Sequence, residues 1–321
     1  MFIAQAFKKE DDSSSVLLNF LKYLVGSVLV FLASLVGQIP LSIAFLYKSY
    51  ISGKFPKNEA EIYKMLDSNL FLFLMLLSFV CAFIGLYFIV EKFHNQKFIT
   101  IITSRTKIDW KRVFFSFFIW AFISISLILA TYFYDSSEIV LQFNLIPFLI
   151  LMVVTFILMP IQTSTEELIF RGYLMQGFYN LAKNKWFPLV MTSVIFGTMH
   201  IMNPEVEKIG YIILVYYIGT GLFLGILTLM DEGTELALGF HAANNIIASL
   251  LITSDYTVFQ TNSIFKDLSD PSAGFEIFLP VFVIFPILLF IFSKVYKWNN
   301  WSKKLFGAAP DNFELKSDYD A

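Results

Sequence analysis

The side chains best suited to chemistry are two glutamates and an arginine in an otherwise apolar stretch, residues 165–171. Glu167 and Arg171 are four residues apart, so on a helix they share one face and can form an ion pair. Glu166 is rotated by about 100° from Glu167 and therefore points elsewhere. One carboxylate could hold the arginine while the other takes part in acid–base catalysis.

A structural role for the glutamates is the alternative. Thr163 or Ser164 followed by a glutamate three residues later matches a capping box, which would begin a helix after Pro160. Within a membrane, however, an unpaired charged residue at a helix centre costs about 2.5–3.5 kcal/mol. Two carboxylates and a guanidinium in such a segment therefore favour a functional site.

Two further polar groups lie in other apolar segments. His200 follows Phe196 by four residues, so the phenylalanine can pack against the imidazole ring. His241 and Asn245 have the same spacing, and both can donate a hydrogen bond to a developing oxyanion. Hydrogen bonding between helices is the alternative role for a single buried histidine. His94 lies in a basic loop and is given no role.

The elements that must position these residues are membrane helices. The 321-residue chain is 57% apolar and 15% charged, whereas a soluble domain is about 45–50% apolar and about 25% charged. A helix crossing the bilayer core needs about 20 apolar residues. The candidate segments are 17–47 (interrupted near Pro40), 70–90, 113–133, 139–162, 165–182, 187–203, 209–230, 236–253 and 275–296.

These segments predict an all-α, polytopic transmembrane bundle with a buried site in its central helices. If residues 139–182 cross once, as a helix broken near Pro160, there are about eight crossings. We expect a cytosolic N-terminal tail at 1–15, a helical domain at 16–300 whose motif-bearing core is about 150–253, and a disordered cytosolic tail at 301–321.

The distribution of Lys and Arg predicts the orientation. The loop 91–112 and the stretch after Ser293 are rich in lysine and arginine, which places them and both termini in the cytosol. The lysines of the loop 48–69 and the acids at 231–235 oppose this topology. We expect a multi-pass protein of the cell membrane whose partners include the lipid bilayer. The net charge of −2 gives no reason to expect nucleic acid.

The three motifs occur in a recognisable order. Glu-Glu-x-x-x-Arg at 166–171, Phe-x-x-x-His at 196–200 and His-x-x-x-Asn at 241–245 resemble those of the CAAX-protease and bacteriocin-processing (Abi) membrane peptidases. The resemblance covers about residues 150–253. It implies an eight-helix core in which Glu166 and His200 activate a water molecule for attack on a peptide bond, and His241 and Asn245 stabilise the oxyanion.

The resemblance also implies supporting roles and a question about metal. Glu167 and Arg171 would order the catalytic helix, with Phe196 packed against His200. We expect that no cofactor is required, so the protein would be a glutamic-type peptidase. The alternative is a metalloprotease whose zinc is held by Glu166, His200 and His241, since two histidines and a glutamate are a reasonable zinc set.

The expected substrate is a peptide or protein, lipid-modified or embedded in the membrane. Two other functions compete with hydrolysis. In a proton-coupled transporter the glutamates and histidines would relay protons. In a non-catalytic immunity or scaffold protein the same polar side chains would only hold helices together.

Overall fold

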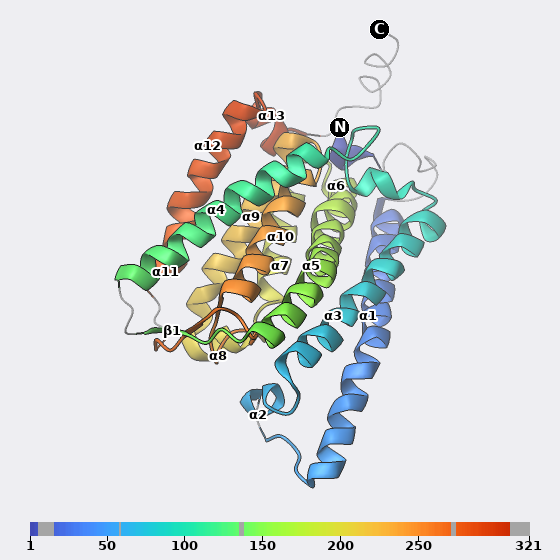
Figure 1. Cartoon of the computed structure of the whole chain (residues 1–321). Helices are drawn as coiled ribbons and strands as arrows, with labels where there is room; N and C mark the ends of the chain where they lie inside the picture. The colour runs from blue at the N-terminus through green and yellow to red at the C-terminus, as the bar shows by residue number, and fades with distance from the viewer. Residues whose placement is uncertain (6–15, 58, 135–137, 271–273, 309–321) are drawn as a thin grey trace.

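The computed structural model describes residues 1–5, 16–57, 59–134, 138–270 and 274–308. Its long helices form one bundle, with α1 and α3 on one side and α12 on the other (Figure 1). The α-helices are α1 Val16–Ser52, α2 Glu59–Tyr63, α3 Ser68–Phe88, α4 Trp110–Tyr134, α5 Leu145–Glu167, α6 Met175–Ala182, α7 Trp186–Thr198, α8 Pro204–Ile209, α9 Leu214–Asp231, α10 Glu235–Leu251, α11 Phe275–Leu279, α12 Phe285–Val295 and α13 Trp301–Phe306.

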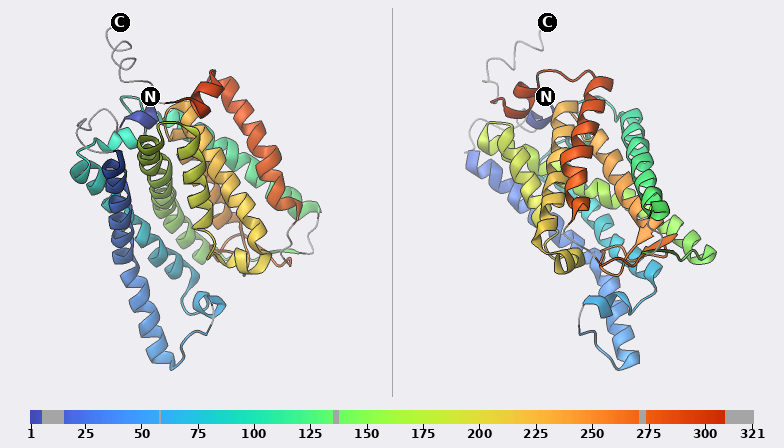
Figure 2. Two further views of the ribbon diagram at one scale, coloured as in Figure 1. Left: turned by 180° about the vertical axis from the view of Figure 1, so that it is seen from behind. Right: turned by 90° about the vertical axis from the view of Figure 1, so that its left-hand side faces the viewer.

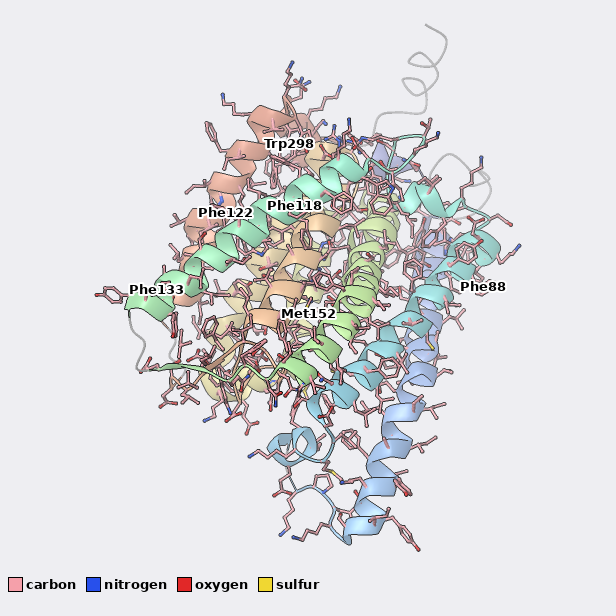
Figure 3. The ribbon with its side chains drawn as sticks, viewed as in Figure 1. Phe88, Phe118, Phe122, Phe133, Met152 and Trp298 are labelled. Carbon is pink, nitrogen blue, oxygen red and sulfur yellow. The ribbon has the colours of Figure 1, made fainter. Side chains whose placement is uncertain are left out.

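Six helical segments within the described residues are long and apolar enough to cross a membrane: Val16–Ser52, Ser68–Phe93, Trp110–Tyr134, Leu145–Ala182, Tyr211–Asp231 and Ile277–Val295. The shorter helices α7 and α10 lie between the later spans in the sequence, and the count of about eight crossings stays a prediction. Large apolar side chains such as Phe88, Phe122 and Phe133 project outward from the bundle (Figure 3), and Phe133 is 80% exposed. The protein is a multi-pass helical membrane protein.

The expected helix break near Pro160 is wrong. Pro160 lies inside α5, and helical structure continues from Leu145 to Ala182 as a single candidate span. Pro40 likewise lies inside the uninterrupted helix α1. Membrane helices tolerate proline where neighbouring helices and hydroxyl side chains satisfy the freed backbone groups. The departure from α-helical geometry comes later, in the π-helical segment Leu168–Leu174 that joins α5 to α6.

The capping-box alternative is also wrong. Glu166 and Glu167 lie at the end of α5, where the helix continues into the π-helical segment instead of beginning. The Thr163 hydroxyl donates a hydrogen bond to the Met159 carbonyl oxygen one turn earlier, at 3.1 Å. The glutamates therefore occupy the interior of a long helical segment, where a helix cap has no function.

A small sheet closes one end of the bundle and corrects the expected start of the fourth helix. Ile139–Leu141 forms strand β1, so the helix begins at Leu145 and not at 139. β1 pairs antiparallel with β3 (Phe265–Asp267), which pairs parallel with β2 (Ile252–Thr253). The last two residues of the apolar segment predicted at 236–253 form β2 instead of continuing the helix. These strands are short, and the fold remains all-α as predicted.

The opposite end of the bundle gathers charges from distant parts of the chain. Arg105 forms ion pairs with Asp231 at 3.0 Å and with Glu235 at 3.1 Å, and Arg112 also contacts Asp231. The acids that opposed the predicted topology are thus paired with the basic loop beside them. Both ends of the described chain lie at this end as well (Figure 1).

The chain ends are packed where they are described. Residues 1–5 include a 3-10 helix, Phe2–Ala4, whose side chains are buried, and the Phe2 N–H donates to Glu232 Oε2 at 2.6 Å. Residues 301–306, expected in a disordered tail, form helix α13. Residues 6–15 and 309–321 of the two expected tails lie outside the described residues. Both views in Figure 2 show α1 extending beyond the rest of the bundle at the other end.

Candidate active site

The Glu167–Arg171 ion pair forms the buried centre of the candidate site. Both side chains are fully buried, and Arg171 Nη1 donates to Glu167 Oε1 at 3.0 Å, as the spacing predicts. Arg171 Nη2 donates to the Gly221 carbonyl oxygen of α9 at 3.2 Å, and its guanidinium lies 4.4 Å from the centre of the Phe196 ring. Arg171 therefore connects the π-helical segment to α7 and α9.

His241 of α10 joins the two glutamates. Its Nδ1 lies 2.7 Å from Glu167 Oε1, and its Nε2 lies 3.6 Å from Glu166 Oε2. A carboxylate oxygen accepts, so Nδ1–H is the donor toward Glu167. This leaves the Nε2 atom of His241 facing Glu166.

Glu166 differs from Glu167 in its access to the surroundings. Its side chain is 18% exposed, whereas that of Glu167 is 0% exposed. Gln162 Nε2, one turn earlier on α5, donates to Glu166 Oε1 at 2.6 Å. Glu166 is therefore the carboxylate of the pair that can meet a substrate or a water molecule, as its different helical face predicts.

His200, just beyond the end of α7, packs against two aromatic rings. Its ring centre lies 4.8 Å from that of Phe196 and 4.3 Å from that of Tyr217, with which it stacks at 20°. Its Nδ1 lies 2.7 Å from the Phe196 carbonyl oxygen, which can only accept, so Nδ1 carries the proton. In the neutral ring Nε2 is then the acceptor, as a general base requires.

Asn245 occupies the same face of α10 as His241 but contacts a different partner. Its Nδ2 donates to Gln162 Oε1 at 2.9 Å. Gln162 thus connects Asn245 with Glu166. Hydrogen bonds join Glu167 to Arg171 and His241, and Gln162 joins Glu166 to Asn245. The two sets meet where His241 Nε2 lies 3.6 Å from Glu166 Oε2, and His200 approaches them through its ring contact with Phe196. Among the described residues, Glu166 and His200 form no direct hydrogen bond or ion pair.

Two residues of this group were not predicted from the sequence. Gln162 has a recognisable signal, because it is a polar residue in an apolar helix, four positions before Glu166. Tyr217 has none, because the chain contains 15 tyrosines and nothing in their spacing marks the one that reaches His200. Its role follows only from the packing of α9 against α7.

The arrangement of the donor groups bears on whether the site can hold a metal ion. Within the part of the chain that the structure describes, no group of three or more His, Cys, Asp or Glu side chains could hold one metal ion. His241 uses Nδ1 toward Glu167, and Glu166 accepts from Gln162. As placed, Glu166, His200 and His241 do not form a three-ligand group, although His241 Nε2, His200 Nε2 and Glu166 Oε2 are left over by the hydrogen bonds named above. The zinc alternative therefore stays a prediction, and we derive no step through zinc.

The remaining histidine, His94, belongs to a separate buried cluster. Its Nε2 lies 2.8 Å from the hydroxyl of Tyr173, in the π-helical segment, and its ring packs 4.6 Å from that of Tyr23 on α1. Gly26 leaves room for the Tyr173 hydroxyl, because a side chain there would overlap it. Burial, with a smaller contribution from the charge of Lys22, lowers the pKa of His94 to about 4.

The low pKa of His94 predicts a pH-dependent contribution to stability, which replacement of His94 should remove. The unfolded chain binds a proton at His94 near pH 6.5 and the folded chain only near pH 4, so stability falls as pH drops through this window. Because the His94 side chain is partly exposed to solvent, which weakens the effect, the free energy of unfolding should fall by about 2 kcal/mol. Thermal unfolding of His94→Gln in detergent should show a shallower dependence on pH than wild type. Identical slopes for both proteins would contradict this prediction.

Comparison with known proteins identifies the segment that carries the site. Residues 145–247 match the family model described as type II CAAX prenyl endopeptidase Rce1-like. A relative from Bacillus subtilis (strain 168), named uncharacterized protein YyaK, is 32% identical over 189 residues, which cover 59% of this chain and 63% of the relative. The chain thus spans less than two thirds of that relative's length.

No solved structure matches the chain significantly. The family match begins where α5 begins and extends beyond Asn245, so it includes every residue of the three motifs. Through this segment the chain is similar to the Rce1-like endopeptidases, which confirms the resemblance to the CAAX-protease and bacteriocin-processing family.

Proposed function

We propose that the protein is an intramembrane endopeptidase that hydrolyses a peptide bond with a water molecule activated by Glu166 and His200. The observation that carries the proposal is the unequal environment of the two glutamates. Glu167 is fully buried and bonded to Arg171 and His241, whereas Glu166 is partly exposed and faces His241 Nε2. One carboxylate organises the site and the other remains accessible for proton transfer.

The proposed reaction needs only water and the residues of this site. Glu166 takes one proton from the water molecule, assisted by His200 Nε2, and the resulting hydroxide adds to the carbonyl carbon. The second N–H of the Asn245 amide and the Nε2–H of protonated His241 donate to the oxyanion. The carbon–nitrogen bond then breaks, the leaving amine takes up the transferred proton, and the products are a carboxylate and an amine.

The position of His241 explains how it could act as such a donor. Its Nδ1–H is used by Glu167, so Nε2 becomes a donor only when the ring carries a second proton. Glu166, the proposed proton acceptor, lies 3.6 Å from that atom. A proton accepted by Glu166 can therefore reach His241 within the site.

The proposed substrate is a peptide or protein segment at or within the membrane, including a lipid-modified one. The site lies between long apolar helices, and Glu166 belongs to the span Leu145–Ala182. A water-soluble substrate would have to enter this bundle. A segment already associated with the bilayer would be presented beside it. We further propose that the termini and the basic loop 91–112 lie in the cytosol.

The proposal is tested with purified protein in detergent and a panel of internally quenched peptides, including prenylated ones, with and without a chelator. We expect cleavage that persists with the chelator and is lost in Glu166→Gln. Loss of cleavage upon chelation, with recovery on addition of zinc, would instead support the metalloprotease alternative. Proton-coupled uptake into liposomes without any cleavage would support a transporter.

A further inference from the structure

A chain of hydrogen bonds leads from α4 through α10 to Glu166. Trp120 Nε1 donates to Asn244 Oδ1 at 3.1 Å, and Asn244 Nδ2 donates to Asn245 Oδ1 at 3.1 Å. Asn245 Nδ2 donates to Gln162 Oε1 at 2.9 Å, and Gln162 Nε2 donates to Glu166 Oε1 at 2.6 Å. Five side chains from three helices thus form one connected series, ending at the proposed base.

The two ends of the series determine its direction. The indole N–H of Trp120 can only donate, and an ionised carboxylate such as Glu166 can only accept. Each amide between them can donate through its nitrogen and accept through its oxygen. The series is complete only if every amide turns its oxygen toward Trp120 and its nitrogen toward Glu166.

Burial makes the opposite amide orientation unfavourable. Trp120 is 5% exposed, Gln162 4% and Asn245 9%. Leaving a buried donor or acceptor without its partner costs about 1–3 kcal/mol, so a reversed amide would be penalised. The Trp120 ring itself is held by Phe240, with ring centres 4.4 Å apart. The tryptophan is therefore a fixed starting point.

Helices α4 and α10 approach each other closely beside this series. Gly239 on α10 faces the carbonyl oxygen of Val113 on α4, and a side chain at this position would overlap that oxygen. This close approach lets an indole on α4 reach an amide on α10. The polar series is thus part of the packing between the two helices.

We propose that Trp120 and Asn244 are positioning residues of the active site, which orient the Asn245 and Gln162 amides so that Gln162 donates to Glu166. The inference rests on the proposed function of Glu166 as the base. Within the described residues, no hydrogen bond or ring contact joins Trp120 or Asn244 to the glutamates or to the histidines. They act through the two amides, and they keep one N–H of Asn245 directed to Gln162 and the other available to the oxyanion.

Two substitutions break the series without emptying the core. Trp120→Phe keeps an aromatic ring and removes the donor, while Asn244→Asp keeps the acceptor for Trp120 and removes the donor to Asn245. We expect each to lower kcat for peptide cleavage about tenfold, the effect of one misdirected hydrogen bond, with KM changed less than about twofold. The double variant should be no slower than the slower single variant, because both changes break one series.

The matched control is Trp110→Phe. Trp110 lies on the same helix, is 59% exposed, and is not part of the series. Its replacement should leave kcat unchanged. If Trp120→Phe and Asn244→Asp keep full kcat while Glu166→Gln abolishes cleavage, the inference is overturned and the proposed function remains.

A second measurement does not depend on activity. In isotope-labelled protein, the indole N–H resonance of Trp120 can be assigned by its loss in Trp120→Phe. Gln162→Ala, which does not contact Trp120, should shift this resonance by releasing the amides between them and should leave the Trp110 resonance in place. An unmoved Trp120 resonance would overturn the inference even if wild-type protein cleaved none of the peptides tested.

Discussion

Glu166→Gln is expected to reduce kcat for peptide cleavage by about 10²- to 10⁴-fold, the usual contribution of a general base. The substitution preserves the shape of the side chain and can still accept the hydrogen bond from Gln162 through its amide oxygen. The neutral amide cannot take a proton from water. Substrate binding should therefore be retained while the chemical step is lost.

The measurement is steady-state cleavage of a quenched peptide by protein in detergent, with thermal unfolding as a check of folding. Glu138→Gln is the matched control, because Glu138 is an exposed carboxylate outside the candidate spans. It should leave both kcat and stability unchanged. Cleavage by Glu166→Gln at the wild-type rate would rule out Glu166 as the base.

Arg171→Met is expected to destabilise the protein by about 3–5 kcal/mol, because removal of one partner leaves a buried, uncompensated charge. Glu167 is fully buried and would keep only the hydrogen bond from His241. The π-helical segment would also lose its connection to the Gly221 carbonyl oxygen. We expect cleavage to fall together with stability.

The double variant Glu167→Gln with Arg171→Met distinguishes a charge effect from a packing effect. Replacement of both members of a buried pair is far less costly than removal of one, so the double variant should recover much of the lost stability. The glutamine can still accept from His241 Nδ1–H. Lys294→Met is the control for loss of an exposed cation, with an expected cost below about 1 kcal/mol. A double variant as unstable as Arg171→Met would refute the explanation by buried charge.

Local spacing predicted the parts of the site that lie within one helix. Glu167 and Arg171 pair, and Phe196 packs against His200, because side chains four residues apart on a helix are neighbours. The same rule places His241 and Asn245 on one face of α10. A different local rule, that a proline breaks a helix, gave a wrong prediction at Pro160. A membrane helix continues through a proline where the surrounding protein satisfies the freed backbone groups.

Contacts between helices could not be predicted in this way. The sequence motifs predict that Glu166 acts with His200 on water, and that His241 acts with Asn245 on the oxyanion. In the structure His241 lies between both glutamates. Spacing along one helix is a local quantity, whereas this contact depends on how α10 packs against α5 and α4.

Apolar length and helical spacing are local properties of the chain, so the amino-acid sequence was enough to predict a polytopic helical membrane protein and to identify the three motifs. Three features became visible only in the folded chain: Glu167 is enclosed while Glu166 stays accessible, Tyr217 stacks on His200, and Trp120 is connected to Glu166 through three amides. These features arise where separate helices meet. Their side chains are brought together by packing, which no spacing along the chain encodes.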